Sequence, residues 1–360
     1  MSDIFRQTKA VINLDNISHN YNALQKKSEK TSLIPVVKAD AYGHGAHAIV
    51  RHLYYNHDVR LFAVSLLEEA LDLDALDLDL EILIMGPLDE PSLRIGADHG
   101  FIFTVASARI WEIVKSIEKP LRFHVKVDTG MHRLGLQEDT LIWEIFNYSK
   151  QRKNLNLEGI FTHFATADSD GVYFMKQKEA FNEVLRRLPY MPPIIHASNS
   201  SAVIKYERNL FHTTHARIGI SLYGYSLEKD VSFLKPVMTL LSVVSEIKTL
   251  AVGEKLGYNI TYEARENERI AILPIGYGDG MIRKNQGGLV SIGGANYSIV
   301  GRVCMDMMFV KVNKTVNEGD EVILFGENHL TADTIAKRTD TISYEVLCQV
   351  SKRVPRVYKK

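Results

Sequence analysis

Short, β-branched apolar runs alternate with helical stretches over the first two hundred residues, and this alternation constrains the fold more than any other feature. The runs cover residues 32–38, 60–65, 81–86, 100–105, 121–128, 157–164, 192–198 and 212–219. Strands that alternate with helices form βαβ units and a parallel sheet. Eight strands over about two hundred residues are typical of a closed (β/α)8 barrel. A doubly wound sheet is the rival, but no G-x-G-x-x-G follows the first strand.

Two of the intervening stretches show a clear helical period. Residues 107–119 place four apolar side chains on one face: Ile110, Ile113, Val114 and Ile117. Residues 173–188 do the same with Phe174, Phe181, Val184 and Leu188. Because a surface helix buries one apolar stripe, both segments are predicted to pack against the barrel.

The pattern changes after about residue 230. Strand-like segments punctuated by glycine and asparagine replace the alternation, which indicates a mainly β second domain. We therefore expect a barrel domain over 1–230 and a β domain over 231–360. Residues 7–15 form a strand-like piece before the barrel. We expect residues 1–12 to pair with the β domain.

Composition excludes several classes of protein. The 360 residues hold 43 Lys+Arg and 43 Asp+Glu, and a nucleic-acid partner would usually require a basic excess. No run of ~18 apolar residues is present to span a membrane. The N-terminus lacks the apolar core of a secretion signal. Two cysteines form no disulfide framework. These observations predict a cytoplasmic protein that binds neither nucleic acid nor membrane.

Two segments could suggest a metal, but neither has the required spacing. The acidic segment 71–81 lacks the glycine and the acid spacing of a calcium loop, so a solvated helix end is the better interpretation. His44 and His47 are three residues apart, without an evident third ligand. We predict no metal site.

The segment VVKADAYGHG, residues 36–45, carries the most informative residue. Lys38 follows a buried strand, at the end of the barrel where barrel enzymes hold their active sites. Desolvation lowers the pKa of a lysine and makes its amine a nucleophile, as Schiff-base chemistry requires. An exposed loop lysine is the alternative that position alone leaves open.

A resemblance to a known family favours a desolvated, nucleophilic Lys38 over an exposed loop lysine. The segment KADAYGHG is similar to the cofactor-lysine signature of the alanine racemases, which use pyridoxal 5'-phosphate. Eight further segments match that family in order: HVKVDTGMHRLG, THFATAD, HASNS, ARIGISLYG, GYNITY, LPIGYGDG, GRVCMDM and RVPR. The resemblance spans nearly the whole chain and implies a (β/α)8 barrel followed by a β domain. It also implies an isomerase that interconverts L-alanine and D-alanine for peptidoglycan.

The resemblance assigns two proton-transfer bases. Racemisation removes a proton from one face of the α-carbon and returns one to the other, so two groups on opposite faces are needed. The matching residues are Lys38, which also holds the cofactor, and Tyr258 in GYNITY. In the family the tyrosine reaches the cofactor of the other subunit. The resemblance therefore implies a homodimer with shared active sites.

The resemblance also identifies residues that bind the cofactor. Arg217 matches an arginine that faces the pyridine nitrogen, and His163 matches the histidine beside it. Because arginine cannot accept a proton, the nitrogen would stay unprotonated, which favours racemisation over transamination. The remaining matches form a phosphate cup: Tyr42, Asn199, Ser200, Gly219 and Ile220. Without the resemblance, Asn199 and Ser200 would be ordinary helix caps.

Three further matches concern the substrate carboxylate. Arg133 and the backbone of Met305 match family contacts, and the planar fork of an arginine suits a carboxylate. Lys126 matches a lysine that is carbamylated in several family members. A carbamate there would be an anion beside Arg133 and would fix its orientation.

One departure from the family leaves the substrate range open. Many relatives have a tyrosine before RVPR, near the phosphate, where this chain has Lys352. A racemase of broader preference, or one for serine, is therefore an alternative. A decarboxylase on the same barrel is another, although Arg217 argues against it. A non-catalytic carrier of pyridoxal phosphate would need Lys38 but no second base.

Overall fold

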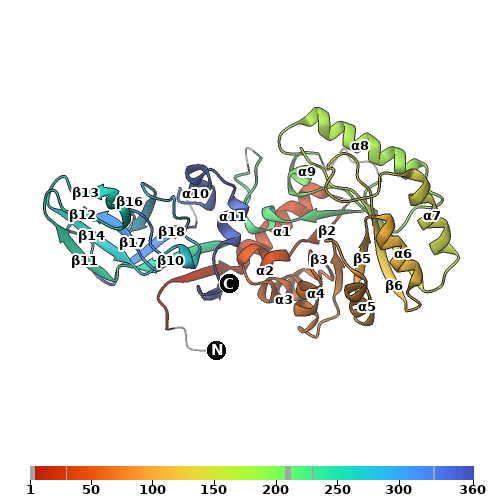
Figure 1. Ribbon diagram of the computed structural model, residues 1–360, viewed down its shortest axis with the longest axis horizontal. Coiled ribbons are helices and arrows are strands. Elements are labelled where there is room, and N and C mark those ends of the chain that lie inside the picture. Colours follow the sequence, from red (N-terminus) through yellow and green to blue (C-terminus); the bar gives the residue numbers. More distant parts are fainter. Residues whose placement is uncertain (1–4, 30, 207–211, 229–230, 327–328) are drawn as a thin grey trace.

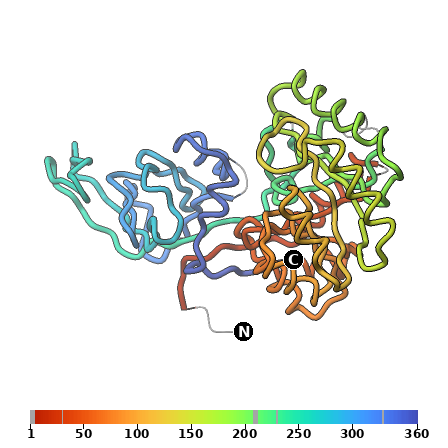
Figure 2. The backbone as a smooth tube through the Cα atoms, turned by 45° about the vertical axis from the view of Figure 1, so that its right-hand side comes forward, coloured from red at the N-terminus to blue at the C-terminus, as the bar shows by residue number. Residues whose placement is uncertain are grey.

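A computed structural model describes residues 5–29, 31–206, 212–228, 231–326 and 329–360. Two lobes lie side by side in Figures 1 and 2, one built on a parallel sheet and the other mainly of β-strands. The first lobe contains eight parallel strands: β2 (Ser32–Pro35), β3 (Leu61–Val64), β4 (Glu81–Ile84), β5 (Ile102–Val105), β6 (Leu121–Lys126), β7 (Leu155–Phe161), β8 (Ile194–His196) and β9 (His215–Ile218). Each strand falls within or overlaps one of the eight predicted runs.

The eight strands close into a barrel. Their order is β2-β9-β8-β7-β6-β5-β4-β3. The two ends meet where the Val37 amide donates to the Ala63 carbonyl at 2.9 Å, beside the Val36–Ala63 bridge. The predicted barrel is confirmed. Its strands bury residues on both faces, which explains their continuous apolar runs.

Helices surround the barrel in Figure 1. They are α1 (Leu14–Ser28), α3 (Ala46–His57), α4 (Leu67–Asp74), α5 (Glu90–Asp98), α6 (Ala108–Ser116), α7 (Asp139–Lys150), α8 (Gly171–Arg186) and α9 (Ser200–Lys205). In α6 the Ser107 side chain caps the first turn, and Ile110, Trp111 and Val114 are buried. The acidic segment 71–81 begins at the end of α4, as predicted. The described residues contain no cluster of side chains that could hold a metal ion.

The second lobe is a nine-stranded sheet, which confirms the predicted β domain. Its order is β11-β14-β17-β16-β15-β18-β10-β1-β19. The bounds are β1 (Lys9–Asn13), β10 (Met238–Val243), β11 (Glu246–Leu250), β14 (Glu268–Leu273), β15 (Leu289–Ile292), β16 (Ala295–Val300), β17 (Met308–Val312), β18 (Glu321–Phe325) and β19 (Arg356–Lys359). The N-terminal strand β1 pairs with β10 and β19. Residue 230, the expected domain boundary, lies outside the described residues.

Smaller elements complete this lobe. A short ladder joins β12 (Lys255–Leu256) to β13 (Tyr262–Glu263), with the turn η3 (Tyr258–Ile260) between them, and a second short turn is η4 (Tyr277–Asp279). Helices α10 (Ala332–Thr339) and α11 (Ser343–Cys348) follow β18. Figure 1 places β12 and β13 at the end of the β lobe farthest from the barrel. Among the described residues, no helix combines the length and apolar character needed to cross a bilayer.

Candidate active site

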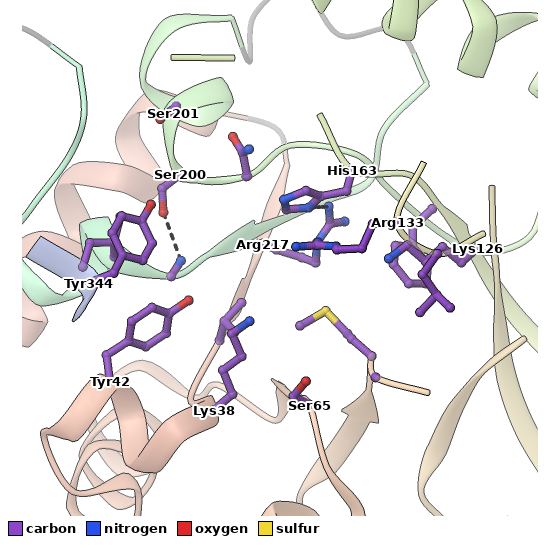
Figure 3. A pocket seen from close by; sticks show the side chains of 18 of the residues that line it. Lys38, Tyr42, Ser65, Lys126, Arg133, His163, Ser200, Ser201, Arg217 and Tyr344 are labelled. Carbon is purple, nitrogen blue, oxygen red and sulfur yellow. Dashed lines mark hydrogen bonds between the residues drawn. The ribbon is translucent and has the colours of Figure 1, made fainter. Parts of the chain in front are cut away.

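A cavity of about 620 Å³ opens at the carboxyl ends of the barrel strands. Its walls come from residues at or just beyond the strand ends, including Val36 after β2, Ser65 after β3, Lys126 in β6 and Phe161 in β7. Loops after parallel strands meet at this edge, so residues far apart in sequence converge here. Figure 3 shows the polar side chains that face the cavity.

Lys38 begins the segment α2 (Lys38–Gly43), and its amine points into the cavity (Figure 3). Burial lowers the pKa of this amine, and the positive charge of Arg133 lowers it further. Four residues that follow, Ala39–Tyr42, have φ near +53°, so the segment is a left-handed turn. Left-handed backbone costs about 1–2 kcal/mol per non-glycine residue. The surrounding contacts must therefore hold this turn in place.

Glu69 and Arg356 provide those contacts. The Glu69 Oε1 atom accepts from the Ala39 amide at 2.6 Å, and Oε2 accepts from the Ser65 amide at 2.8 Å. Arg356, from the RVPR segment, donates from Nε to the Gly43 carbonyl at 2.9 Å. The carboxylate of α4 thus ties the start of the turn to the end of β3. Nothing in the sequence indicates this role of Glu69, which occupies an ordinary position in the first turn of a helix.

One end of the cavity forms a cup of hydroxyl and amide groups. The Ser200 Oγ atom accepts from the Gly219 amide at 3.0 Å. A side chain on Gly219 would place its Cβ 2.5 Å from the Tyr42 hydroxyl oxygen, so only glycine allows this approach. Ile220 also lines the cup. The structure brings these predicted phosphate-binding residues together.

Tyr344 is a member of the cup that sequence reasoning missed. Its ring lies 6.0 Å from the ring of Tyr42, and burial raises the pKa of its hydroxyl to about 12. Figure 3 shows both rings beside Ser200. Lys352, expected here from its place before RVPR, instead lines a second cleft of about 830 Å³ with Asp40 and His47. Lys352 lies in a turn and is exposed.

Asn199 lines the cavity, but its amide group serves the helix. Its Oδ1 atom accepts from the Ala202 amide at 3.0 Å, which caps α9. Its Nδ2 atom donates to the Phe164 carbonyl at 3.2 Å. The structure therefore shows the capping role that the sequence had left open beside cofactor binding.

Arg217 and His163 lie at the opposite end of the cavity from the cup (Figure 3). Arg217 is 3% exposed. Its guanidinium donates to three carbonyl oxygens, of Thr162, His196 and Ala197, and to the Nδ1 atoms of His163 (3.3 Å) and His196 (2.7 Å). The guanidinium is positively charged, because arginine does not lose its proton in proteins. Burial and this charge hold the pKa of His163 well below its usual range.

Arg133 and Lys126 line the same side of the cavity. Arg133 lies in the loop after β6, which Asp128 shapes by accepting from the amides of Gly130 and His132, each at 3.0 Å. Lys126 is 6% exposed. Burial lowers its pKa to about 8, and the charges of Arg217 and Arg133 contribute. Two cations thus gather where an anionic group of a ligand could bind.

Tyr258 and Met305 do not line this cavity. Tyr258 is 66% exposed and Met305 is 52% exposed, and both belong to the β lobe. Other exposed apolar side chains of this lobe include Ile260, Tyr277 and Met307. We call these five residues the β-lobe patch. Hydrogen bonds from the amides of Tyr277 and Gly278 to the carbonyls of Cys304 and Met305 join two of its loops.

Comparisons with known proteins cover both lobes. Residues 12–227 match the family described as "Alanine racemase, N-terminal domain", and residues 237–358 match "Alanine racemase, C-terminal domain". A curated alanine racemase of Staphylococcus epidermidis is 37% identical, with 98% of this chain and 95% of the relative covered. One of Staphylococcus carnosus is also 37% identical, covering 100% and 97%.

Solved structures give the same result. The crystal structure of alanine racemase from E. faecalis superposes with a TM-score of 0.92 at 34% identity, covering 98% of each chain. That of alanine racemase from Bacillus anthracis with bound L-Ala-P superposes with a TM-score of 0.91 at 30% identity. It covers 100% of this chain and 96% of that one.

Proposed function

The chain belongs to the alanine racemase family of pyridoxal-phosphate-dependent isomerases, its reaction is the interconversion of L-alanine and D-alanine, and we propose that two copies share each active site. Lys38 of one copy and Tyr258 of the other are the two bases. One observation carries this proposal. The Lys38 amine lies in a cavity between an anion cup and a buried arginine, while Tyr258 stands exposed on the other lobe.

The residues of the cavity fit pyridoxal phosphate. The cup of Tyr42, Ser200 and the Gly219–Ile220 backbone suits the phosphate, because hydroxyl and amide donors bind phosphate oxygens. The Ser221 hydroxyl in the same loop is buried, with no hydrogen-bond partner among the described residues, so a donor there remains to be satisfied. Arg217 stands at the other end, where it can donate to the ring nitrogen. When bound, the cofactor acidifies the α-proton of the amino acid.

Lys38 supplies the first base. Burial and the charge of Arg133 lower the pKa of its amine, so more of it is neutral near pH 8 than for an exposed lysine. A neutral Nζ atom can take a proton from the α-carbon and can return it. Lys38 therefore acts on one face of the substrate, and an acid–base group must stand on the other.

Tyr258 of a second copy supplies the group on the other face. His163 borders the cavity, and its Nδ1 atom accepts from Arg217, so its neutral ring carries hydrogen on Nε2. A phenol oxygen that accepts from this N–H is stabilised as the phenolate. The tyrosine hydroxyl can then exchange a proton with the α-carbon on the face opposite Lys38.

Arg133, with the backbone of Met305 from the second copy, binds the substrate carboxylate in this proposal. Arg133 lines the cavity on the Lys126 side and forms no ion pair among the described residues. A planar guanidinium can form two parallel hydrogen bonds with a carboxylate. Fixing the carboxylate orients the Cα–H bond toward one of the two bases.

The β-lobe patch is an argument that a second copy completes the site. The patch holds five exposed apolar residues, and hydrogen bonds join two of its loops. Exposed apolar residues that lie together mark protein interfaces. Tyr258 and Met305 lie within this patch. Docking it over the cavity of another copy would cover apolar surface and deliver both residues at once. A symmetric homodimer of this kind contains two equivalent sites.

We place this reaction in the cytoplasm, where D-alanine supplies peptidoglycan synthesis. The two cysteines are free, which agrees with a reducing compartment. Expression in a bacterial strain that requires D-alanine should restore growth without the supplement. A Lys38→Ala variant is the control, and equal growth with this variant would contradict the assignment.

Chiral chromatography tests the reaction and its substrate. Purified protein with pyridoxal phosphate is incubated with single L-amino acids, beside Lys38→Ala and Tyr258→Phe. D-Alanine should be the main product, and both variants should lose it. A predominance of D-serine would overturn the substrate assignment. Cofactor binding without any D-enantiomer would favour the carrier or the decarboxylase.

A further inference from the structure

Three buried side chains form a row that leads from the cavity into the barrel. Arg217 of β9 donates from Nη1 to the Nδ1 atom of His196 of β8 at 2.7 Å. The Nε2 atom of His196 lies 3.0 Å from the Nδ1 atom of His124 of β6. Both histidines are fully buried, and the ring of His196 stacks on Phe161 at 4.5 Å with 12° between the planes. The stack holds the plane of the central ring.

Hydrogen counting fixes the tautomer of both rings. A guanidinium can only donate, so the Nδ1 atom of His196 must be the acceptor. The hydrogen of a neutral His196 then sits on Nε2 and is donated to His124. Nδ1 of His124 is therefore an acceptor as well, and its hydrogen sits on Nε2. All these hydrogen bonds run away from the cavity, from Arg217 toward the barrel interior.

The row ends on a ring nitrogen that forms no hydrogen bond to stabilise the fold. The Nε2 atom of His124 is buried without a hydrogen-bond partner among the described residues. An unpaired buried polar atom costs about 1–3 kcal/mol. The ring also requires Gly159 of β7, because a Cβ there would lie 2.8 Å from three of its atoms. An apolar side chain would fill this place at lower cost, so packing alone does not account for His124.

We propose that His124 is a positioning residue, which holds His196 in the Nε2–H tautomer and thereby fixes Arg217 at the cavity. This inference rests on the proposed function, in which Arg217 faces the cofactor. If His196 carried its hydrogen on Nδ1 instead, two donors would face each other at 2.7 Å and Arg217 would have to move. His124 prevents this because it offers the acceptor that the Nε2–H tautomer needs.

Nitrogen NMR of protein labelled with ¹⁵N-histidine tests the tautomers directly, with and without cofactor. The variants are His124→Phe, which removes the acceptor, and His124→Asn, whose side-chain oxygen replaces Nδ1. Thr104→Val is the matched control, because Thr104 pairs with His124 in register and its hydroxyl donates elsewhere, to the Ile84 carbonyl at 2.8 Å. Pyruvate formed by transamination is measured beside D-alanine.

Wild type, His124→Asn and Thr104→Val should show His196 as the Nε2–H tautomer. His124→Phe should populate the Nδ1–H tautomer and raise the ratio of pyruvate to D-alanine about fivefold or more. An Nδ1–H tautomer of either histidine in the wild type would overturn the proposal, even if the phenylalanine variant fails to fold. The proposal would also be overturned if His124→Phe left both the His196 tautomer and the product ratio unchanged. Absence of D-alanine from wild type with the expected tautomers would refute the proposed function alone.

Discussion

Lys126 has a pKa well below that of an ordinary lysine. Burial, with Arg217 and Arg133 nearby, lowers its pKa from 10.5 to about 8. Only a neutral amine reacts with carbon dioxide, forming an N–C bond and releasing a proton. At fixed dissolved carbon dioxide, the carbamate should therefore increase as the pH rises through 8. An anion at this position would face Arg133 and orient it.

Carbon NMR with ¹³C-enriched carbon dioxide measures this modification. A carbamate signal should appear between pH 7 and 9 and should be absent from Lys126→Gln. A signal of equal size in this variant would place the carbamate elsewhere. An unmodified amine at pH 9 under carbon dioxide would exclude the modification of Lys126.

In the proposed function, Arg217 determines which reaction follows loss of the α-proton. Its guanidinium cannot accept a proton, so a ring nitrogen facing it would stay unprotonated. Arg217→Glu would replace it with a group that can share a proton with that nitrogen. Racemisation should fall by about 10²-fold or more, and pyruvate from transamination should rise. A loss of racemisation without any pyruvate would contradict this role, provided the variant still binds cofactor.

At the scale of elements, the left-handed turn after Lys38 depends on the carboxylate of α4. Glu69→Gln retains one oxygen but presents an amide donor where a backbone N–H now donates. The substitution should lower the stability of the turn by about 1–3 kcal/mol, and the affinity for cofactor should fall accordingly. Glu68→Gln, one residue earlier and without such a bond to the turn, is the control. Equal affinities in both variants would show that Glu69 does not hold the turn.

A buried carboxylate stabilises the hairpin that carries Tyr258. Glu268 is 3% exposed, and it accepts from the Tyr262 hydroxyl and from Lys311 Nζ, the latter at 2.9 Å. Burial alone would raise its pKa, but the hydrogen bonds from Tyr262 and Lys311 lower it below its usual value. The ionised Glu268 therefore stabilises the fold fully when the pH is above the ordinary pKa of a glutamate. This stabilisation is lost as the pH falls through the lowered pKa of Glu268 in the folded protein.

Glu268→Gln should cost roughly 2 kcal/mol of stability, because a neutral amide replaces the charged acceptor of two hydrogen bonds. Activity should fall with it, since β13 and η3 position Tyr258. Thermal unfolding at pH 7 and pH 4 measures the effect. The difference between wild type and variant should shrink at the lower pH, and a constant difference would contradict the ionised state of Glu268.

The strands could be predicted from sequence because each is a local pattern. All eight apolar runs contain or overlap a barrel strand, and α6 lies within its predicted stretch. The turn after Lys38 could not be predicted, since four non-glycine residues at positive φ contradict local preference. Glu69, Tyr344 and His124 were missed for a related reason. Their roles come from contacts between distant segments, which no spacing along the chain reveals.

At the scale of the whole molecule, the β-lobe patch should control assembly. Met307→Glu places a charge in the patch and should shift the protein toward monomer and lower activity per chain. Met191→Glu is the matched control, because Met191 is 49% exposed against 50% for Met307 and precedes β8, at the opposite end of the barrel from the cavity. Analytical sedimentation measures the oligomeric state of both variants. Monomers in both variants, or in neither, would contradict an interface at this patch.

The most direct test of the shared site mixes two inactive variants. Lys38→Ala and Tyr258→Phe are purified, combined under conditions that exchange subunits, and assayed for D-alanine. A hybrid dimer holds one site with both native residues and one site with neither. Since half of randomly paired dimers are hybrids, activity should return to about a quarter of wild type. If the mixture stays as inactive as its components while hybrids form, Lys38 and Tyr258 do not act across two chains.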